Sequence, residues 1–151
     1  MMRAWQIVGA ALIGLWLSGC DAAWQQVSPP PPVASGRARI YVYRAPTVYD
    51  STVWTAVLLN GTVIGVSAPG AAFYRDVAPG TYQVEPRSDN LYPDQAKTIA
   101  VKAGQTVFVK VQPVPNWNRT GRQTTGNTFT VAIVDPAIGL YEIGSLRLTR
   151  G

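Results

Sequence analysis

The single cysteine of the chain, Cys20, has the surroundings that chemistry at a thiol requires. It ends an apolar stretch, Ala4 to Leu17, which follows the positive charge of Arg3, and the two residues before it, Ser18 and Gly19, are small. Small residues let a peptidase reach the bond before the cysteine, and a thiolate is readily alkylated. A short charged region followed by an apolar one is typical of a cleaved export signal.

The tetrapeptide Leu17-Ser18-Gly19-Cys20 is similar to the lipobox of bacterial lipoproteins, in which the chain is cut before the cysteine and the thiol receives diacylglycerol. The apolar stretch is shorter than the ~20 residues of a bilayer-spanning helix, and no basic flank follows it. We therefore expect residues 1–19 to be a signal peptide and Cys20 to be the lipid attachment site. The alternatives are an ordinary secretory signal with a chance cysteine or an uncleaved anchor helix.

This anchor predicts a location in the bacterial cell envelope, facing the periplasm. Asp21 resembles the signal that holds enteric lipoproteins at the inner membrane. Because that rule varies between bacterial groups, the choice between inner and outer membrane stays open. From Asp21 to Gly36 the chain turns to Ala, Gln, Ser and Pro, and four consecutive prolines, Pro29 to Pro32, predict an extended spacer over residues 20–37.

Composition excludes several kinds of catalytic and metal site. The 151 residues include no histidine and one cysteine, so zinc sites, His-dependent nucleophiles and disulfide frameworks cannot form within one chain. Most acidic residues of the domain fall in predicted turns or on polar strand faces, and nothing indicates that two of them converge as a glycosidase requires. They are Asp50, Asp76, Glu85, Asp89, Asp94, Asp135 and Glu142. We expect no enzyme, no catalytic residue, no metal and no cofactor.

Other reactive-looking groups have simpler explanations. Lys97, Lys102 and Lys110 are predicted to point outward from strands, so none is expected to serve a serine nucleophile. The loop with Asp89, Asn90 and Asp94 lacks the spacing of a calcium loop. Arginines alternate with tyrosines near one strand, but an exported protein is not expected to bind nucleic acid, and these residues predict a strand flank or contact with anionic lipid headgroups. They are Arg37, Arg39, Tyr41, Tyr43 and Arg44.

The segment from Pro113 to Gly126 differs from the rest in having the composition of a loop. A loop of this length exceeds the usual hairpin connection, and long loops in compact domains are often functional. Trp and Arg are enriched at interface anchors, so Trp117, Arg119 and Arg122 are the candidate partner-binding residues. The alternative is that Trp117 covers an open end of the domain.

The remaining chain, residues 38–151, has the pattern of an all-β domain. Polar and apolar residues alternate in several short runs, Asn60-Gly61 predicts a type I′ hairpin, and Pro69-Gly70 and Pro79-Gly80 predict type II turns. The tail from Leu140 to Leu148 fits either a strand or a short helix. Seven or eight short strands separated by Pro, Gly and Asn turns predict an antiparallel β-sandwich of transthyretin or immunoglobulin type, with a barrel as the second choice.

Five motifs in this order, behind a lipobox, give the chain its family resemblance. They are Arg39 to Arg44, the hairpin Leu58 to Gly65, Phe73-Tyr74, Val77 to Tyr82, and Ala103 to Val111. The chain resembles the bacterial family called domain of unknown function 2846 over about residues 37 to 148, and it departs from the family's pattern between Pro113 and Gly126. The resemblance implies a small β-sandwich lipoprotein or envelope protein, and no activity comes with it.

The function expected from these features is docking. A lipid-anchored, non-enzymatic domain would bind another envelope protein as an accessory or assembly subunit, through a strand edge or through the Trp117 segment. The alternative is a module that binds glycan or peptidoglycan by stacking exposed aromatic rings on sugars. The membrane, through Cys20, is the one partner that the sequence itself indicates.

Overall fold

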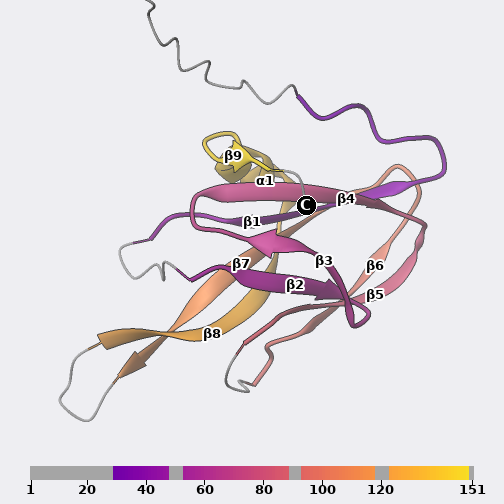
Figure 1. Cartoon of the computed structure of the whole chain (residues 1–151). Helices are drawn as coiled ribbons and strands as arrows, with labels where there is room; N and C mark the ends of the chain where they lie inside the picture. The colour runs from indigo at the N-terminus through magenta and orange to yellow at the C-terminus, as the bar shows by residue number, and fades with distance from the viewer. Residues whose placement is uncertain (1–28, 48–52, 89–92, 118–122, 150–151) are drawn as a thin grey trace, which may run out of the picture.

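The computed structural model describes residues 29–47, 53–88, 93–117 and 123–149, and these fold as two packed β-sheets (Figure 1). Sheet A has the strand order β8-β7-β1-β4-β9, and sheet B has the order β3-β2-β5-β6. The predicted all-β sandwich is confirmed. The elements are β1 (Ala38–Arg44), β2 (Thr55–Leu59), β3 (Thr62–Ser67), β4 (Ala71–Val77), β5 (Gly80–Pro86), β6 (Lys97–Val101), β7 (Thr106–Trp117), β8 (Gln123–Val134), α1 (Pro136–Ile143) and β9 (Arg147–Leu148).

Most strand pairs are antiparallel, and two in sheet A are parallel. β1 pairs with β4 in antiparallel fashion and with β7 in parallel fashion, and the short β9 runs parallel to β4. Strand β1 is therefore the centre of sheet A, with neighbours that come from distant parts of the chain. Alternation of side chains in β1 places Ile40 and Val42 in the core between the sheets, as predicted.

Strand β1 is buried on both of its faces. Tyr41 and Tyr43 point away from the core between the sheets, yet they are only 7% and 1% exposed. They form a second apolar cluster with Phe108, Ala72 and residues of the C-terminal segment. Helix α1 covers this outer face of sheet A, so sheet A lies between sheet B and the helix.

The tail, for which the sequence left two possibilities, contains both a helix and a strand. Asp135 caps α1 by accepting a hydrogen bond from the Ala137 N–H at 2.9 Å, and Pro136 takes the first helical position, where no N–H is needed. The helix ends after eight residues, and Arg147–Leu148 then adds β9 to the edge of sheet A.

Two of the three predicted turns are confirmed. Asn60 and Gly61 have φ of 50° and 76°, as a type I′ hairpin requires, and Gly70 has φ of 66° in a turn closed by the Ala71 N–H and the Ala68 carbonyl. The type II turn predicted at Pro79-Gly80 is wrong, because Gly80 has no positive φ and is instead the first residue of β5.

The loop predicted from Pro113 to Gly126 is mostly strand. β7 and β8 are 12 residues each and stay paired out to Trp117 and Gln123, with a register shift between Pro113 and Pro115. The prolines are tolerated because β1 accompanies β7 only as far as Lys110, which leaves that edge of β7 without a ladder to break. The two strands project from the sandwich as an arm (Figure 1).

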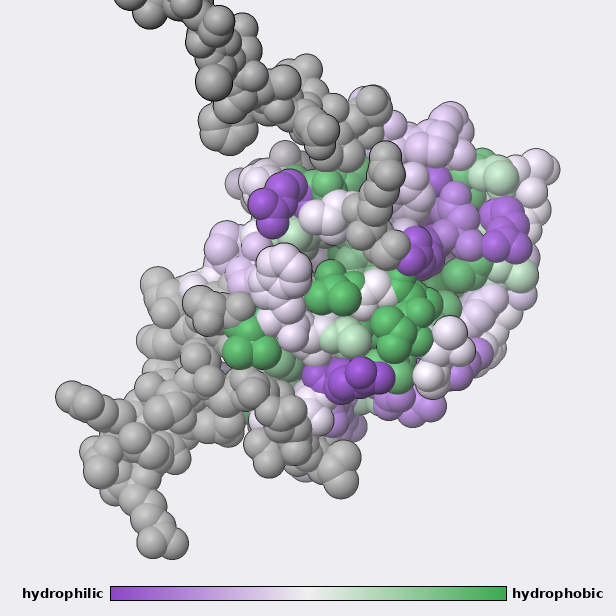
Figure 2. Space-filling model, viewed as in Figure 1, coloured by the Kyte–Doolittle hydropathy of each residue, from purple (hydrophilic) through white to green (hydrophobic). Residues whose placement is uncertain are grey.

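The outer face of sheet B carries an apolar patch on the hairpin of β2 and β3. The strand register pairs Val66 with Ala56 and Val63 with Leu58, so these four side chains share one face, and alternation adds Trp54. Trp54, Val63 and Val66 are 67%, 47% and 46% exposed. Figure 2 shows hydrophobic side chains gathered over β2 and β3 on the side toward the viewer. These five residues are called the β2–β3 patch below.

Candidate functional site

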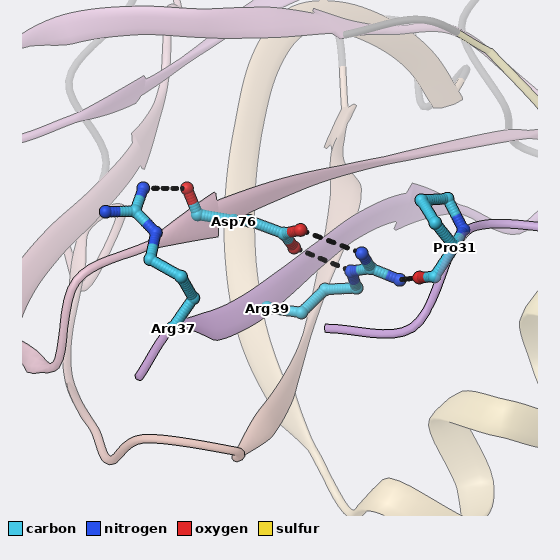
Figure 3. Close-up of polar contacts among 4 residues, drawn as sticks. All are labelled: Pro31, Arg37, Arg39 and Asp76. Atoms are coloured by element: carbon cyan, nitrogen blue, oxygen red, sulfur yellow. Dashed lines mark hydrogen bonds and ion pairs between the residues drawn. The ribbon is translucent and has the colours of Figure 1, made fainter. Parts of the chain in front are cut away.

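Arg39, near the start of β1, forms an ion pair with Asp76 of β4 (Figure 3). Arg39 donates from Nε and Nη2 to the two carboxylate oxygens of Asp76, at 2.7 and 2.8 Å, and its guanidinium lies 4.1 Å from the ring centre of Tyr74. The hydrogen bonds from Arg39 hold the pKa of Asp76 below its ordinary value. Arg39 is 3% exposed, so this arginine is a structural cation of sheet A.

The same arginine holds the proline-rich spacer against the sheet. Arg39 donates from Nη1 to the carbonyl of Pro31 at 2.7 Å, and Arg37 donates from Nη2 to the backbone carbonyl of Asp76, also at 2.7 Å (Figure 3). The chain reaches β1 from Pro31 through a turn in which the Arg37 N–H binds the Ala34 carbonyl. The spacer therefore has a fixed point of contact on the outer face of sheet A.

A second polar cluster attaches α1 to the sheet. Glu142 accepts a hydrogen bond from the Tyr43 hydroxyl on one carboxylate oxygen and from Lys110 Nζ, at 2.5 Å, on the other. Burial and the bond to this carboxylate raise the pKa of Tyr43, while Lys110 and Tyr43 together lower the pKa of Glu142. Lys110 points out of the core, as predicted, but α1 covers it.

Neither cluster is suited to catalysis. Tyr43, Lys110 and Glu142 satisfy one another, and a raised pKa keeps the Tyr43 phenol protonated and weakly nucleophilic. Within the residues that the structure describes, no group of three or more His, Cys, Asp and Glu side chains is placed to hold a metal ion. These networks explain why buried charges are tolerated in sheet A, and their role is architectural.

An open hollow of about 490 Å³ lies between β8 and the segment that leads into β6. Asp94 and Lys97 are the charged residues among the described ones that line it, and their carboxylate and ammonium are 3.9 Å apart. A hydrolase of the two-carboxylate type needs a second acid across such a cleft. The described lining supplies one carboxylate only.

The residues predicted for partner binding are only partly described. Trp117 is the last residue of β7, paired with Gln123 where the arm ends. Arg119 and Arg122, like Cys20, lie outside the described residues. The structure therefore places the backbone of Trp117 far from the sandwich, on the arm, and does not test whether the three side chains meet.

The β2–β3 patch was missed by sequence reasoning. By residue type alone Trp54 is expected to be a core or rim aromatic, as are Tyr49 and Tyr92, which lie outside the described residues. The signal was present in β2, where Ala56 and Leu58 alternate with the core residues Val57 and Leu59. A strand with apolar side chains on both faces is expected to be packed against other elements on both, but sheet B faces the core on one side only.

Comparison with known proteins assigns a family and little else. No helix within the described residues is long and apolar enough to cross a membrane. No match was found among curated proteins or among solved structures. Residues 34–121, more than half of the chain, match the model of a family described as protein of unknown function (DUF2846), so the chain belongs to this family, as its motifs predicted.

Proposed function

We propose that this protein is a lipid-anchored, non-enzymatic component of the bacterial envelope that docks to another envelope protein as an accessory or assembly subunit. The lipid on Cys20 would fix it to the membrane and raise its local concentration near a membrane partner. The observation that carries the docking proposal is the β2–β3 patch, an exposed apolar surface on the outer face of sheet B.

The patch has the composition of a binding surface. Its centre is apolar and carries no charge, and its one aromatic residue, Trp54, is of the type that most often anchors interfaces. The neighbouring positions on the same face are mostly polar, as the rim of an interface usually is: Glu85, which pairs with Leu58, and the exposed Thr81, Gln83 and Thr98, with Ala100 as the apolar exception. A contiguous apolar surface with a polar border indicates a protein partner.

Co-purification from living cells tests this proposal. Tagged full-length protein is cross-linked, purified from detergent-solubilised envelopes and analysed by mass spectrometry, with Cys20→Ser as the unanchored control. The patch variant is Val63→Glu with Val66→Glu, and its matched control is Thr81→Glu with Thr98→Glu on the same face. We expect one membrane protein to co-purify in stoichiometric amount with the wild-type protein and with the control variant. It should be absent from purifications of the patch variant and of Cys20→Ser.

Other outcomes locate or refute the interface. Loss of the partner with Trp117→Ala, but not with the patch variant, would move the interface to the β7–β8 arm. Recovery of the protein alone, or with peptidoglycan fragments only, would overturn the docking proposal.

The exposed indole of Trp54 supports one alternative, a module that binds glycan. A ring that is 67% exposed can stack on a sugar face, as carbohydrate-binding aromatics do. In this case muropeptides would change the intrinsic fluorescence of the wild-type protein but not of Trp54→Ala. No response in the wild-type protein would exclude this alternative.

A further inference from the structure

The outward side of α1 is apolar, which is the reverse of what a surface helix ordinarily shows. Ile138, Leu140 and Tyr141 are 54%, 60% and 86% exposed. Glu142 is the one charged residue of the helix, and its carboxylate is turned toward the sheet, where Tyr43 and Lys110 bind it. The helix thus turns its charge toward the sheet and presents hydrocarbon and a phenol ring outward.

The N-terminal tether leaves the domain on the same side. Pro31 is bound by Arg39, whose side chain shares the outer face of sheet A with Tyr41 and Tyr43, and α1 covers that face. In Figure 1 the described start of the chain runs along this side of the sandwich. Nine positions separate Pro29 from Cys20, which even a fully extended chain spans in about 30 Å. An anchor on Cys20 would therefore keep this face within roughly that distance of the bilayer.

We propose that α1 lies on the surface of the lipid bilayer through Ile138, Leu140 and Tyr141, and that this contact orients the anchored domain. The inference rests on the lipid anchoring proposed above. Apolar side chains of an interfacial helix insert into the boundary between headgroups and acyl chains, and tyrosine is enriched at that depth. No charged side chain of α1 would have to leave water on insertion, because Glu142 is already bound to the sheet.

A bilayer fits this surface better than a protein does. Three side chains on one short helix offer on the order of a few hundred Å², whereas specific protein interfaces bury about 1,200 Å² or more. A weak lipid contact is sufficient here, because the acyl chains already hold the protein at the membrane. The β2–β3 patch lies on the outer face of the other sheet, so this orientation directs it away from the lipid, where a partner can reach it.

Fluorescence quenching at two opposite positions tests the orientation. The full-length lipidated protein carries Tyr141→Cys or, as the matched control, Val63→Cys, each labelled with an environment-sensitive fluorophore. Lipidation consumes the thiol of Cys20, so the introduced thiol is the only one that reacts. The protein is reconstituted on vesicles of phosphatidylethanolamine and phosphatidylglycerol, with or without brominated acyl chains, and iodide serves as the aqueous quencher. Both positions are well exposed, so neither change removes core packing.

We expect the label at position 141 to lose most of its emission to brominated lipid and to be shielded from iodide, while the label at position 63 shows the opposite. If the protein floats with the vesicles but iodide quenches both labels and brominated lipid quenches neither, the proposed orientation is overturned and the anchor stands. Shielding of position 141 from iodide without quenching by brominated lipid would indicate self-association and overturn it too. An unmodified Cys20 in mass spectra, or no flotation, would overturn the anchor itself.

Discussion

Gly139 of α1 lies directly against the ring of Phe108 in β7: a Cβ at position 139 would be 2.3 Å from Cγ of Phe108. Nonbonded carbon atoms do not approach so closely, so the helix reaches this depth only because residue 139 has no side chain. Gly139 is the buried residue of α1, surrounded by exposed neighbours. The distance between helix and sheet is therefore set at this one position.

Substitution of this glycine is expected to loosen the helix. Gly139→Ala forces α1 or Phe108 to move and should lower the free energy of unfolding by about 1 to 3 kcal/mol, as overpacking of a core does. Chemical denaturation measures the change. The matched control is Gly144→Ala at the end of the same helix, where φ is −59° and the nearest contact of a Cβ would be 3.4 Å from a carbonyl oxygen. An equal loss in both variants would contradict this account of the Phe108 contact.

Acid should weaken the domain through Asp76. Because Arg39 lowers the pKa of Asp76 in the folded state, the ion pair contributes its full stability above the unfolded-state pKa of about 3.8 and loses it as the pH falls through the lower folded-state value. Asp76→Asn should cost about 2 kcal/mol at neutral pH, less than a fully buried pair because Asp76 is partly exposed. The unfolding free energy of Asp76→Asn should also change less with pH in this acid range than that of the wild-type protein.

Urea denaturation at several pH values measures both effects. Asp94→Asn is the control, since Asp94 is 88% exposed on its side chain and lies 3.9 Å from Lys97. Surface pairs of this kind contribute little. If Asp94→Asn flattens the acid dependence as much as Asp76→Asn does, the Arg39 pair is not its source.

Alkali should weaken the domain through Tyr43. The pKa of this phenol is raised in the folded state, so its contribution is complete below the ordinary tyrosine pKa of about 10 and is lost as the pH rises through the higher folded-state value. Tyr43→Phe should therefore reduce the fall in stability above about pH 10. Thermal unfolding at a series of alkaline pH values measures this fall. Tyr141→Phe, at an 86% exposed position, should leave the dependence of stability on pH as it is in the wild-type protein.

The anchor itself is tested at Cys20. Cells expressing the wild-type chain should incorporate labelled fatty acid into the protein, and the protein should partition into detergent-rich phase. Cys20→Ser should abolish both, because the hydroxyl is not alkylated in place of the thiolate. Fatty acid incorporation that persists in Cys20→Ser would refute this residue as the attachment site.

The inner faces of the sandwich were predictable because they follow a simple period. Ile40 and Val42 alternate with bulky neighbours, and Asn60-Gly61 has one common structural use. The burial of the outer face of β1, which carries Tyr41 and Tyr43, was not predictable in this way. Tyr41 and Tyr43 have the amphipathic character of a solvated face, and the helix that covers them is too short for a periodic signal to distinguish it from a strand.

The candidate surfaces show the same division. Composition indicated a loop around Trp117, whereas strand pairing with β8 overrode the loop propensity of the prolines and asparagines there. Trp54 and Val63 are ordinary strand residues by type, and only the sheet order shows that the outer face of sheet B keeps them exposed. Exposure of this kind depends on tertiary arrangement, which no local pattern encodes.

The central position of β1 has a consequence for how the domain folds. β1 is the first strand to be made, yet its neighbour β7 begins at Thr106, and the hydroxyl of Tyr43 binds a carboxylate 99 residues further along the chain. Pairings of such sequence separation make folding slow, because a long loop must close before they form. In a chain that emerges from its N-terminus, β1 can pair with β4 once Val77 is present, but its other edge stays unpaired until β7 follows, about 30 residues later. Until then the outer face of β1, with Tyr41 and Tyr43, also lacks the cover that Phe108 and the C-terminal segment supply in the folded domain.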